Sequence, residues 1–458
     1  MAAIISLAKR RGFIFQGSEI YGGLAGTWDY GPLGVALKNN IKRLWWKRFV
    51  DDREDMYGMD TAILMRQEVW KASGHVGGFS DPLVECSKCK KRFRADHFPP
   101  PSRPDLKDSK KVQPCPECGG ELGAARQFNM MFQTHIGPST PLGAGAEEND
   151  PSVSYLRPET AQGMFVNFKN IIDSFHPKLP FGMAQIGKAF RNEIAPRDFL
   201  FRTREFEQME IEYFVKPDEW KKVFEHFVKE TKDFFTKDLG LPASKVHELE
   251  VPDGERAHYS KRTIDFEFDY PFGKKELSGL AYRTDFDLSA HTKASSVDLS
   301  YYDDETPSTG SRQAKSRFVA HCIEPSFGLD RLVLAALSDA YSEDTLGGET
   351  RTFLKLAPSI APVKVAVFPL LKNKPDLVKK AREVYALIRK EIPETMFDDN
   401  GNIGKRYRRQ DEIGTPHCVT VDFDSLEKGD VTLRDRDSGK QERISIGSLL
   451  KILQGKLK

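Results

Sequence analysis

The chain has 458 residues, of which 30% are charged and 11% are aromatic. This length predicts roughly two to four domains with ample core. No apolar run is long enough to cross a bilayer, so we expect a soluble globular protein without a membrane segment. A net charge of +2 neither favours nor excludes a nucleic-acid partner.

The N-terminal segment, MAAIISLAKRRGF, carries a short apolar patch before its basic residues. A secretory signal has the opposite order. Glu19 and Asp29 follow soon and no serine-rich, acid-poor leader precedes them, which argues against a mitochondrial transit peptide. We therefore expect a cytoplasmic location.

The next predicted element is an amphipathic helix in GPLGVALKNNIKRLWWKRF, which includes Pro32. Leu37, Ile41, Leu44 and Trp45 recur at helical spacing and would form one apolar side. On these residues alone, the helix would be an ordinary part of a core.

Cysteines then mark a separate unit, because Cys86 and Cys89 form one CxxC pair and Cys115 and Cys118 another. Paired thiolates on tight turns can close a tetrahedral zinc site, and PCPECGG has the turn-forming residues that this requires. Four cysteines leave no open coordination position, so such a metal would be structural. The interval of 25 residues is longer than in a usual zinc ribbon, so a metal-free insertion is the alternative. The two other cysteines read as small buried hydrophobic residues.

The segment from Phe181 to Val215 predicts two antiparallel strands with polar side chains on a common side. On the first strand, this side would carry Gln185, Gly187, Ala189, Arg191 and Glu193. Its small residues would leave room for a ligand. On the second strand, Phe206, Gln208, Glu210 and Glu212 would face that way, while Met209, Ile211, Tyr213 and Val215 would enter the core.

The loop between these strands carries Arg197, Arg202 and Arg204. Guanidinium groups can bind phosphate oxygens with two parallel hydrogen bonds. For any single arginine, a surface ion pair with a nearby glutamate is the simpler interpretation. The whole constellation favours a nucleotide triphosphate.

A second nucleotide signal is EPSFGLDR, Glu324 to Arg331, which lies between a strand-like RFVAHCI and a helix-like LDRLVLAALSDAY. Gly328 would allow close backbone approach at the helix start, and Arg331 would point from the first turn toward the same cavity. A glycine before a helix is weak evidence alone. Together with the arginine-rich hairpin, it becomes strong.

The C-terminal part begins after a linker near Leu356 to Pro362. A strand, the helix PDLVKKAREVYALIRKE, the cationic KRYRR, a strand near His417 and a terminal helix predict an open α/β layer. Residues 361–458 contain 20 Lys or Arg and 15 Asp or Glu, a net charge of +5. This excess would help to hold a polyanion, although it is also common on solvated surfaces.

Five blocks carry a resemblance to a known family: GSEIYGGLAGTWDYGPLG (Gly17 to Gly34), RPETAQGMF (Arg157 to Phe165), FRNEIAPR (Phe190 to Arg197), REFEQMEIEYF (Arg204 to Phe214) and EPSFGLDR. On these residues the chain resembles the homodimeric, bacterial-like type of glycyl-tRNA synthetase, a class II aminoacyl-tRNA synthetase, over essentially its full length. The helix containing Pro32 occupies the place of the family's dimer-interface motif.

The resemblance implies an α+β fold: a class II antiparallel sheet flanked by helices, a small Cys-rich insertion of the zinc-ribbon type and a C-terminal α/β anticodon-binding domain. Residues 1–84 and 126–356 would form the catalytic core, 85–125 the insertion and 357–458 the anticodon-binding domain.

The implied reaction is the ATP-dependent attachment of glycine to tRNA(Gly) through a glycyl-adenylate. It needs no protein nucleophile for its first step. It needs two anions to be positioned and charge on the phosphorus oxygens to be stabilised, which suits arginines and Mg²⁺.

The ATP-site roles that the resemblance implies centre on three catalytic arginines. Arg191 would hold the α-phosphate, Arg202 the β- and γ-phosphates, and Arg331 a purine face or the γ-phosphate. Glu193 would bind the adenine amino edge and Phe206 would stack under the purine. The full ATP site would comprise Arg191, Asn192, Glu193, Phe201, Arg202, Thr203, Arg204, Glu205, Phe206, Glu276, Leu277, Gly328, Leu329, Asp330 and Arg331. Among these, Glu276 would be a ligand of Mg²⁺.

The resemblance also implies the glycine pocket, in which several carboxylates face one ammonium group. Its residues would be Arg94, Glu159, Phe206, Glu207, Gln208, Met209, Glu210, Glu324, Pro325, Ser326, Phe327 and Gly328. Alanine would be rejected by crowding of its methyl group, and no smaller amino acid can compete. For Arg94, an ordinary surface arginine is an equally good interpretation.

Other functions stay open at this point. One is a class II synthetase for another amino acid, such as histidine, proline or threonine, against which EPSFGLDR and RPETAQG favour glycine. Another is a noncatalytic, synthetase-like nucleic-acid-binding protein, from which we expect loss of Arg191, Glu193, Arg202 and Arg331. A zinc-ribbon binding protein would leave the arginine-rich hairpin without a function.

Overall fold

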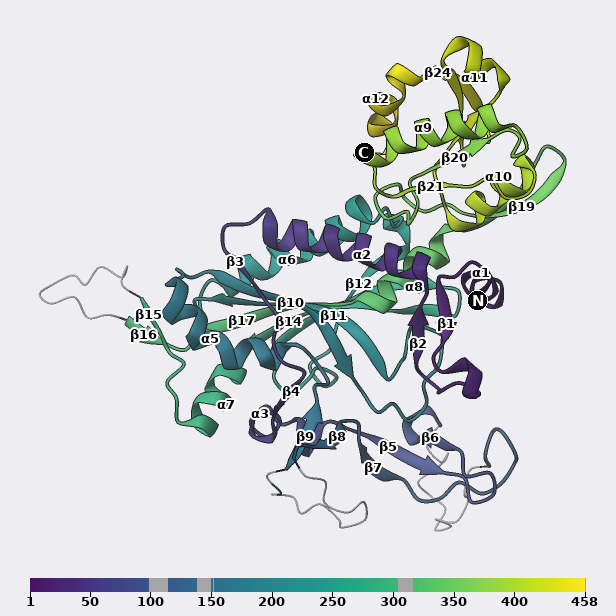
Figure 1. Cartoon of the computed structure of the whole chain (residues 1–458). Helices are drawn as coiled ribbons and strands as arrows, with labels where there is room; N and C mark the ends of the chain where they lie inside the picture. Colours follow the sequence, from purple (N-terminus) through teal and green to yellow (C-terminus); the bar gives the residue numbers. More distant parts are fainter. Residues whose placement is uncertain (99–113, 138–149, 151, 304–315, 458) are drawn as a thin grey trace, which may run out of the picture.

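The centre of the molecule is a seven-stranded sheet (Figure 1). The computed structural model describes residues 1–98, 114–137, 150, 152–303 and 316–457. In spatial order the strands are β12 (Val246–Glu250), β13 (Arg262–Tyr270), β14 (Gly273–Thr284), β17 (His321–Gly328), β11 (Glu205–Val215), β10 (Phe181–Phe190) and β3 (Met56–Met59). All neighbouring strands are antiparallel except β10 and β3. This sheet confirms the predicted α+β core.

Strands β10 and β11 form the antiparallel pair that the sequence alternation predicts. Gln185 lies opposite Glu210, and Gly187 lies opposite Gln208. Because opposite residues of an antiparallel pair share a face, the polar side chains of both strands point to the same side of the sheet.

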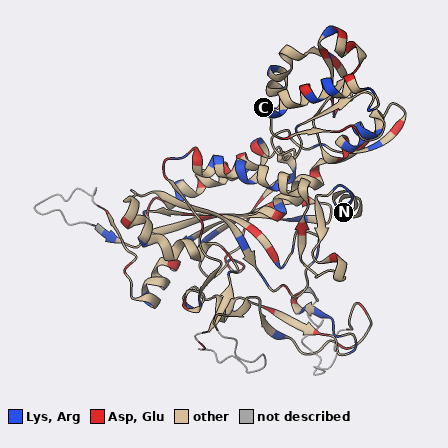
Figure 2. Ribbon diagram, in the orientation of Figure 1, with Lys and Arg blue, Asp and Glu red and all other residues tan. Residues whose placement is uncertain are grey.

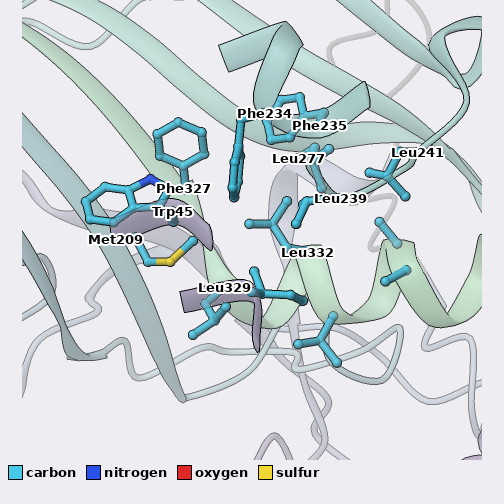
Figure 3. Close-up of a cluster of buried hydrophobic side chains, with 14 of the residues drawn as sticks. Trp45, Met209, Phe234, Phe235, Leu239, Leu241, Leu277, Phe327, Leu329 and Leu332 are labelled. Carbon is cyan, nitrogen blue, oxygen red and sulfur yellow. The ribbon is translucent and has the colours of Figure 1, made fainter. Parts of the chain in front are cut away.

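One face of the sheet is covered by three helices: α2 (Pro32–Trp46), α6 (Trp220–Asp233) and α8 (Leu329–Ala340). Between the helices and the sheet lies the main core, part of which Figure 3 shows. Trp45 of α2 packs its ring 6.0 Å from that of Phe327 on β17. The predicted helix at Pro32 is confirmed, with the proline in its first turn, where no hydrogen-bond donor is needed.

The opposite face carries α5 (Ala161–Phe175) and α7 (Phe286–Ser295). A second core cluster lies here, in which the rings of Phe168 and Phe214 are 4.5 Å apart. The apolar part of this cluster covers only one end of the sheet. Polar side chains of β11, β14 and β17 occupy the remainder of this face.

Short elements surround the main sheet. In the first part of the chain these are α1 (Ala2–Arg10), β1 (Ile14–Gln16), β2 (Trp28–Tyr30), β4 (Leu64–Arg66), α3 (Gln67–Ala72) and α4 (His75–Gly78). The predicted insertion, residues 85–125, lies within a sheet formed by β5 (Ser80–Glu85), β6 (Arg92–Arg94) and β7 (Arg126–Asn129), while β8 (Phe132–His135) and β9 (Val153–Leu156) pair beside β4. A further hairpin comprises β15 (Tyr301–Asp303) and β16 (Ser316–Phe318). Residues 99–113 of the predicted insertion lie outside the described residues.

The C-terminal domain has its own sheet and core. In spatial order its strands are β21 (Thr395–Phe397), β20 (Val365–Pro369), β22 (His417–Val421), β23 (Asp430–Asp435) and β24 (Gln441–Ser445). Its helices are α9 (Pro375–Glu391), α10 (Ile403–Ile413), α11 (Phe423–Lys428) and α12 (Ile446–Lys456). The predicted α/β layer is confirmed, and the cationic KRYRR lies on α10. A hairpin of β18 (Tyr341–Leu346) and β19 (Glu349–Leu354) follows α8 and precedes this domain.

None of the helices in the described part of the chain has the length and apolar character needed to traverse a bilayer.

Candidate active site

Two adjoining cavities lie on the polar side of β10, β11, β14 and β17. The first, here called the arginine cavity, has a volume of about 290 Å³. Its lining includes Arg94, Arg191, Glu193, Phe201, Arg202, Thr203, Phe206, Glu207, Gly328, Asp330 and Arg331. The second, the acidic cavity, measures about 260 Å³ and its lining includes Glu159, Glu210, Asp265 and Glu324. Arg191, Gln208, Glu276 and Ser326 line both cavities, so the two spaces adjoin.

Arg191 is held at this boundary by several contacts. Its Nε donates to the carbonyl of Pro158 at 3.1 Å. Its guanidinium carbon lies 5.3 Å from the ring centroids of both Phe79 and Phe206. Aromatic faces attract a guanidinium cation, so these rings fix Arg191 between the two cavities.

Arg331 enters the arginine cavity from the first turn of α8, as the sequence predicts. Its guanidinium forms an ion pair with Glu276 at 3.0 Å and lies 4.5 Å from the ring centroid of Phe201. The positive charge of Arg331 lowers the pKa of Glu276. A Cβ at Gly328 would lie 3.3 Å from Cδ of Arg331, so glycine leaves this side chain its space. Burial lowers the pKa of Arg202, which lines the same cavity.

Glu210 on β11 lines the acidic cavity, and its carboxylate oxygens accept hydrogen bonds from three neighbouring residues. Ser326 Oγ donates to its Oε1 at 2.6 Å, and Gln208 Nε2 donates to the same oxygen at 2.7 Å. The backbone N–H of Thr160 donates to Oε2 at 3.0 Å. Burial raises the pKa of Glu210, and the nearby charge of Glu159 raises it further.

Arg283 is the cation within this acidic cluster, and its side chain is 1% exposed. Its Nε and Nη2 donate to Asp287, both at 2.8 Å, and its guanidinium lies 3.8 Å from the ring centroid of Tyr259. Burial disfavours its charge, but Asp287 and Glu324 outweigh that effect and its pKa is raised. Burial raises the pKa of Glu324 to about 8, although Arg283 opposes the rise.

Glu159 completes the cluster. Its Oε1 accepts a hydrogen bond from Gln162 Nε2 at 3.0 Å, and its Oε2 lies 3.3 Å from Nε2 of His75. Burial alone would raise the pKa of Glu159, but His75 and then Arg283 lower it overall. Because several carboxylates share one arginine, the acidic cavity is suited to a small cation such as an ammonium group.

Comparison with known proteins identifies both large parts of the chain. Residues 146–340 match the family model described as "tRNA synthetase class II core domain (G, H, P, S and T)", and residues 364–456 match "Anticodon binding domain". Proteins named glycine--tRNA ligase are similar over the whole chain. The one from Caldanaerobacter subterraneus subsp. tengcongensis is 49% identical over 476 residues, covering 100% of this chain and 98% of its own length. Those from Treponema denticola and Thermobifida fusca are 48% and 47% identical, again over 100% of this chain and 97% and 98% of their own lengths.

The chain belongs to the glycine--tRNA ligase family. The predicted class II core and anticodon-binding module are thereby confirmed. The arginine-rich hairpin and EPSFGLDR, on which the resemblance depended, lie within the matched core. Arg191 and Arg331, which the sequence predicts to face one site, both line the arginine cavity.

The structure places several other predicted site residues of this family member away from the cavities. The side chains of Met209, Leu277, Phe327 and Leu329 are buried in the main core, as Figure 3 shows. For Met209, Leu277 and Phe327, period-two alternation explains this, because the neighbours of a cavity residue on a strand point to the opposite face. Leu329 lies in the first turn of α8 and packs in the main core. Pro325 lies on β17 opposite Leu280, and Asn192 donates its backbone N–H to the carbonyl of Met130 at 2.7 Å.

Charged residues of the hairpin are also divided between the two faces. Glu205 pairs with Lys188 at 2.8 Å, and the carboxylate of Glu207 pairs with Lys38 of α2 at 2.6 Å, although Glu207 borders the arginine cavity. Arg204 donates to the carbonyls of Ala25 at 2.9 Å and Glu193 at 3.1 Å, and it lies outside both cavities.

The prediction that small residues on β10 leave room for a ligand is wrong at Gly187. A Cβ there would lie 2.3 Å from Nη2 of Arg157. Arg157 is 2% exposed, and its Nε donates to the carbonyl of Lys188 at 2.6 Å. The space is therefore filled by a buried arginine of the RPETAQGMF block, which braces the strand from the side of the acidic cavity.

Sequence reasoning missed four groups that shape the acidic cavity: His75, Asp265, Arg283 and Asp287. Asp265 lines the cavity with Glu276, and burial together with the charge of Glu276 raises its pKa to about 7. No local motif marks these residues. Alternation along Arg262–Tyr270 and Gly273–Thr284 is the only sequence signal that could have placed Asp265 and Arg283 on the polar face.

The predicted metal site is assembled by Cys86, Cys89, Cys115 and Cys118, whose sulfur atoms all lie within 4.8 Å of one another. Cys86 Sγ lies 3.6 Å from Cys118 Sγ, and Cys89 Sγ lies 3.7 Å from Cys115 Sγ. Tetrahedral Zn–S bonds of about 2.3 Å place two sulfurs about 3.8 Å apart. All six cysteines of the chain are free thiols, and the four-sulfur donor set fits zinc.

Proposed function

We propose that this chain attaches glycine to tRNA(Gly) in two steps, through a glycyl-adenylate formed in the two adjoining cavities. The observation that carries the proposal is that a cavity lined by Arg191, Arg202 and Arg331 opens into one lined by Glu159, Glu210 and Glu324. The first suits a triphosphate and the second suits an ammonium group. Their shared boundary is where the glycine carboxylate and the α-phosphorus would meet.

On the nucleotide side, Arg191 binds the α-phosphate and stabilises the charge that develops on its oxygens during attack. Arg202 and Arg331 bind the outer phosphates, so that pyrophosphate leaves in line with the attacking carboxylate. The adenine stacks on Phe206, and Glu193 accepts from its amino group. Phe201, which lies under Arg331, and Thr203 complete the cavity wall.

On the amino-acid side, Glu159, Glu210 and Glu324 surround the ammonium of glycine. Ser326 and Gln208 hold Glu210 in place through their hydrogen bonds. The selectivity for glycine arises by exclusion, because a methyl group on the substrate would meet side chains that are already fixed by Arg283 and Thr160.

Mg²⁺ is the cation that this site would use. Glu276 and Asp265 line the acidic cavity together and would hold the ion, which needs only one or two carboxylates besides phosphate oxygens and water. When bound, it supplies positive charge to the phosphate oxygens. The ion pair of Glu276 with Arg331 connects the metal ligand to the arginine cavity.

The C-terminal domain binds tRNA in this proposal, and the matched anticodon-binding family supports that role. We place the anticodon-binding domain at residues 357–458, the Cys-rich insertion at 85–125, and the two parts of the catalytic core at 1–84 and 126–356. Zinc in the four-cysteine site would hold the ends of the insertion together. Arg94 extends from the insertion to the arginine cavity, and its guanidinium pairs with Asp96, which lies outside the cavity lining, at 2.6 Å.

We further propose a homodimer in the cytoplasm. The N-terminal block exposes large apolar side chains, with Ile20 and Tyr21 each 88% exposed and Leu24 53% exposed. This block precedes α2, where the family resemblance places the dimer motif. A second copy would cover these residues. Sedimentation analysis should show a dimer for the wild type and a monomer for the Ile20→Asp/Tyr21→Asp variant.

The test of the function is amino-acid-dependent exchange between ATP and pyrophosphate. Exchange should require glycine, and alanine, serine and proline should not replace it. Arg191→Ala should abolish exchange while circular dichroism and thermal unfolding stay as in the wild type. Exchange driven equally well by another amino acid, or retained by Arg191→Ala, would refute the proposal.

A further inference from the structure

A buried ionic cluster joins the hairpin that follows α8 to the C-terminal domain. Arg351 on β19 donates from Nη1 to Oδ2 of Asp411 on α10 at 3.2 Å. Arg434 on β23 donates to both oxygens of Asp411, at 2.7 and 3.0 Å. The side chains of Arg351 and Asp411 are 0% and 1% exposed. One carboxylate therefore connects two arginines from different elements.

Backbone carbonyls complete the same junction. Arg351 also donates to the carbonyls of Arg436 at 2.7 Å and Asp437 at 3.0 Å. In the reverse direction, Arg436 Nη1 donates to the carbonyls of Leu356 at 2.9 Å and Gly414 at 2.8 Å. Arg351 of the hairpin thus bonds to the C-terminal domain, and Arg436 of that domain bonds back to Leu356, two residues after β19, through guanidinium groups of fixed geometry.

The hairpin side of this junction is anchored to α8. The backbone N–H of Lys355, at the end of the hairpin, donates to the carbonyl of Ala340 at the end of α8. Helix α8 begins beside the arginine cavity with Arg331. Ile413 at the end of α10 packs in the main core with Leu356. A continuous set of contacts therefore runs from the arginine cavity through α8 and the hairpin to α10.

Helix α10 carries four Lys or Arg residues within positions 405–409, and Figure 2 shows the basic residues of this helix gathered together. Lys405, Arg408 and Arg409 lie on its accessible side, whereas Arg406 is buried. Buried ion pairs contribute little to stability because desolvation offsets their attraction, but their strict geometry can select one packing arrangement. The cluster is therefore better suited to fixing the direction of α10 than to stabilising the fold.

We propose that Arg351 is a positioning residue for the transfer step, which acts through Asp411 to hold α10 at a fixed orientation to the two cavities. This inference rests on the proposed function. A tRNA bound along α10 must place its 3′ end at the adenylate, so a change in the direction of α10 displaces the acceptor hydroxyl. Adenylate formation uses only groups of the two cavities and does not depend on this orientation.

The test compares Arg351→Met, Arg351→Lys and Asp411→Asn with the wild type. Glycine-dependent exchange of ATP and pyrophosphate should stay within about twofold, while transfer of glycine to tRNA falls by about 10- to 100-fold, as expected for a misplaced reacting group. The loss should appear in kcat more than in KM for tRNA. Arg351→Lys keeps the charge without the guanidinium fork and should recover part of the transfer rate.

Glu349→Gln is the matched control. Glu349 pairs with Arg408 at 3.1 Å and so connects the same two elements, β19 and α10, but its side chain is 81% exposed. An exposed pair contributes little, so this variant should charge tRNA as the wild type does.

Equal losses of exchange and transfer in Arg351→Met and Asp411→Asn would overturn the inference, since they would show a general loss of structure. Wild-type transfer rates in both variants would overturn it as well. A wild-type protein without glycine-dependent exchange would instead overturn the proposed function, and with it the basis of this inference.

Discussion

Arg283 donates two hydrogen bonds from Nη1 to the carboxylate of Glu324, at 3.0 and 2.9 Å. It also neutralises Asp287, so one guanidinium serves two carboxylates while Glu159 and Glu210 lie close by. The carboxyl groups of Glu159, Glu210, Asp287 and Glu324 therefore outnumber the one buried guanidinium that they share. A substrate ammonium would supply the missing positive charge, which connects this ion network to the choice of glycine.

The first prediction concerns Glu210→Gln. The neutral amide keeps the shape of the side chain but removes one charge from the ammonium site. A hydrogen bond to a charged group contributes about 1.5–3 kcal/mol, so KM for glycine in the exchange reaction should rise about 10- to 100-fold. The dissociation constant of ATP, measured by calorimetry, should change little.

Glu248→Gln is the control for this variant, because Glu248 lies on β12 at the edge of the same sheet and pairs with Lys232 at 2.6 Å. It should match the wild type in both measurements. Equal losses of glycine and ATP affinity in Glu210→Gln would contradict a role confined to the amino acid.

A second prediction separates the two faces of β11. Gln208 lines both cavities, whereas Met209 is fully buried in the main core. Met209→Ala should lower the free energy of unfolding by about 2–5 kcal/mol and leave KM for glycine and ATP unchanged. Gln208→Ala should change KM for glycine with little loss of stability. Denaturant unfolding measures the stability of both variants, and exchange kinetics measure their KM values. A large increase in KM for Met209→Ala would contradict the division of β11 into a cavity face and a core face.

The third prediction is a pH dependence of stability that arises from Glu324. Its pKa is raised to about 8, so the folded protein binds this proton more tightly than the unfolded chain does. The contribution to stability is fully present below the unfolded pKa and is lost as pH rises through about 8. The amide of Glu324→Gln has no acidic proton to lose. The thermal midpoint of this variant should therefore increase relative to that of the wild type as pH rises from about 5 to about 8. Parallel pH profiles of the two proteins would count against a protonated Glu324.

Much of the site could be predicted because its residues lie close together in the sequence. The hairpin that carries Arg191 and Glu210 depends on alternation within one segment, and the structure has the predicted pairing. The same alternation correctly places Met209 in the core. Its prediction as a glycine-pocket residue came from the family resemblance, which does not distinguish the two faces of the strand.

Other features could not be predicted because they depend on packing between distant segments. Arg283 meets Glu324 across 41 residues, and Arg351 meets Asp411 across 60. Arg157 directly follows β9 and fills the space above Gly187 from 30 residues earlier in the chain. Nothing in the local pattern of any of these residues identifies its partner, since each contact is fixed only when the sheet and the helices pack together.

A fourth prediction concerns zinc. The purified protein should contain one zinc ion per chain, and the Cys86→Ser/Cys115→Ser variant, which removes one thiol from each CxxC pair, should contain none. Cys418→Ala should keep its zinc, because Cys418 is buried in the C-terminal domain. Elemental analysis of the three proteins decides the matter. Zinc retained by the double variant, or absent from the wild type, would exclude a four-cysteine site.

The most direct measurement of the central claim is a crystal structure with a non-hydrolysable glycyl-adenylate analogue. In that structure the glycyl ammonium should lie among Glu159, Glu210 and Glu324, with the adenine against Phe206 and the group that replaces the phosphate beside Arg191. An analogue bound with its amino group outside the acidic cavity, or with its adenine away from the arginine cavity, would show that the two cavities are not the site of adenylate formation.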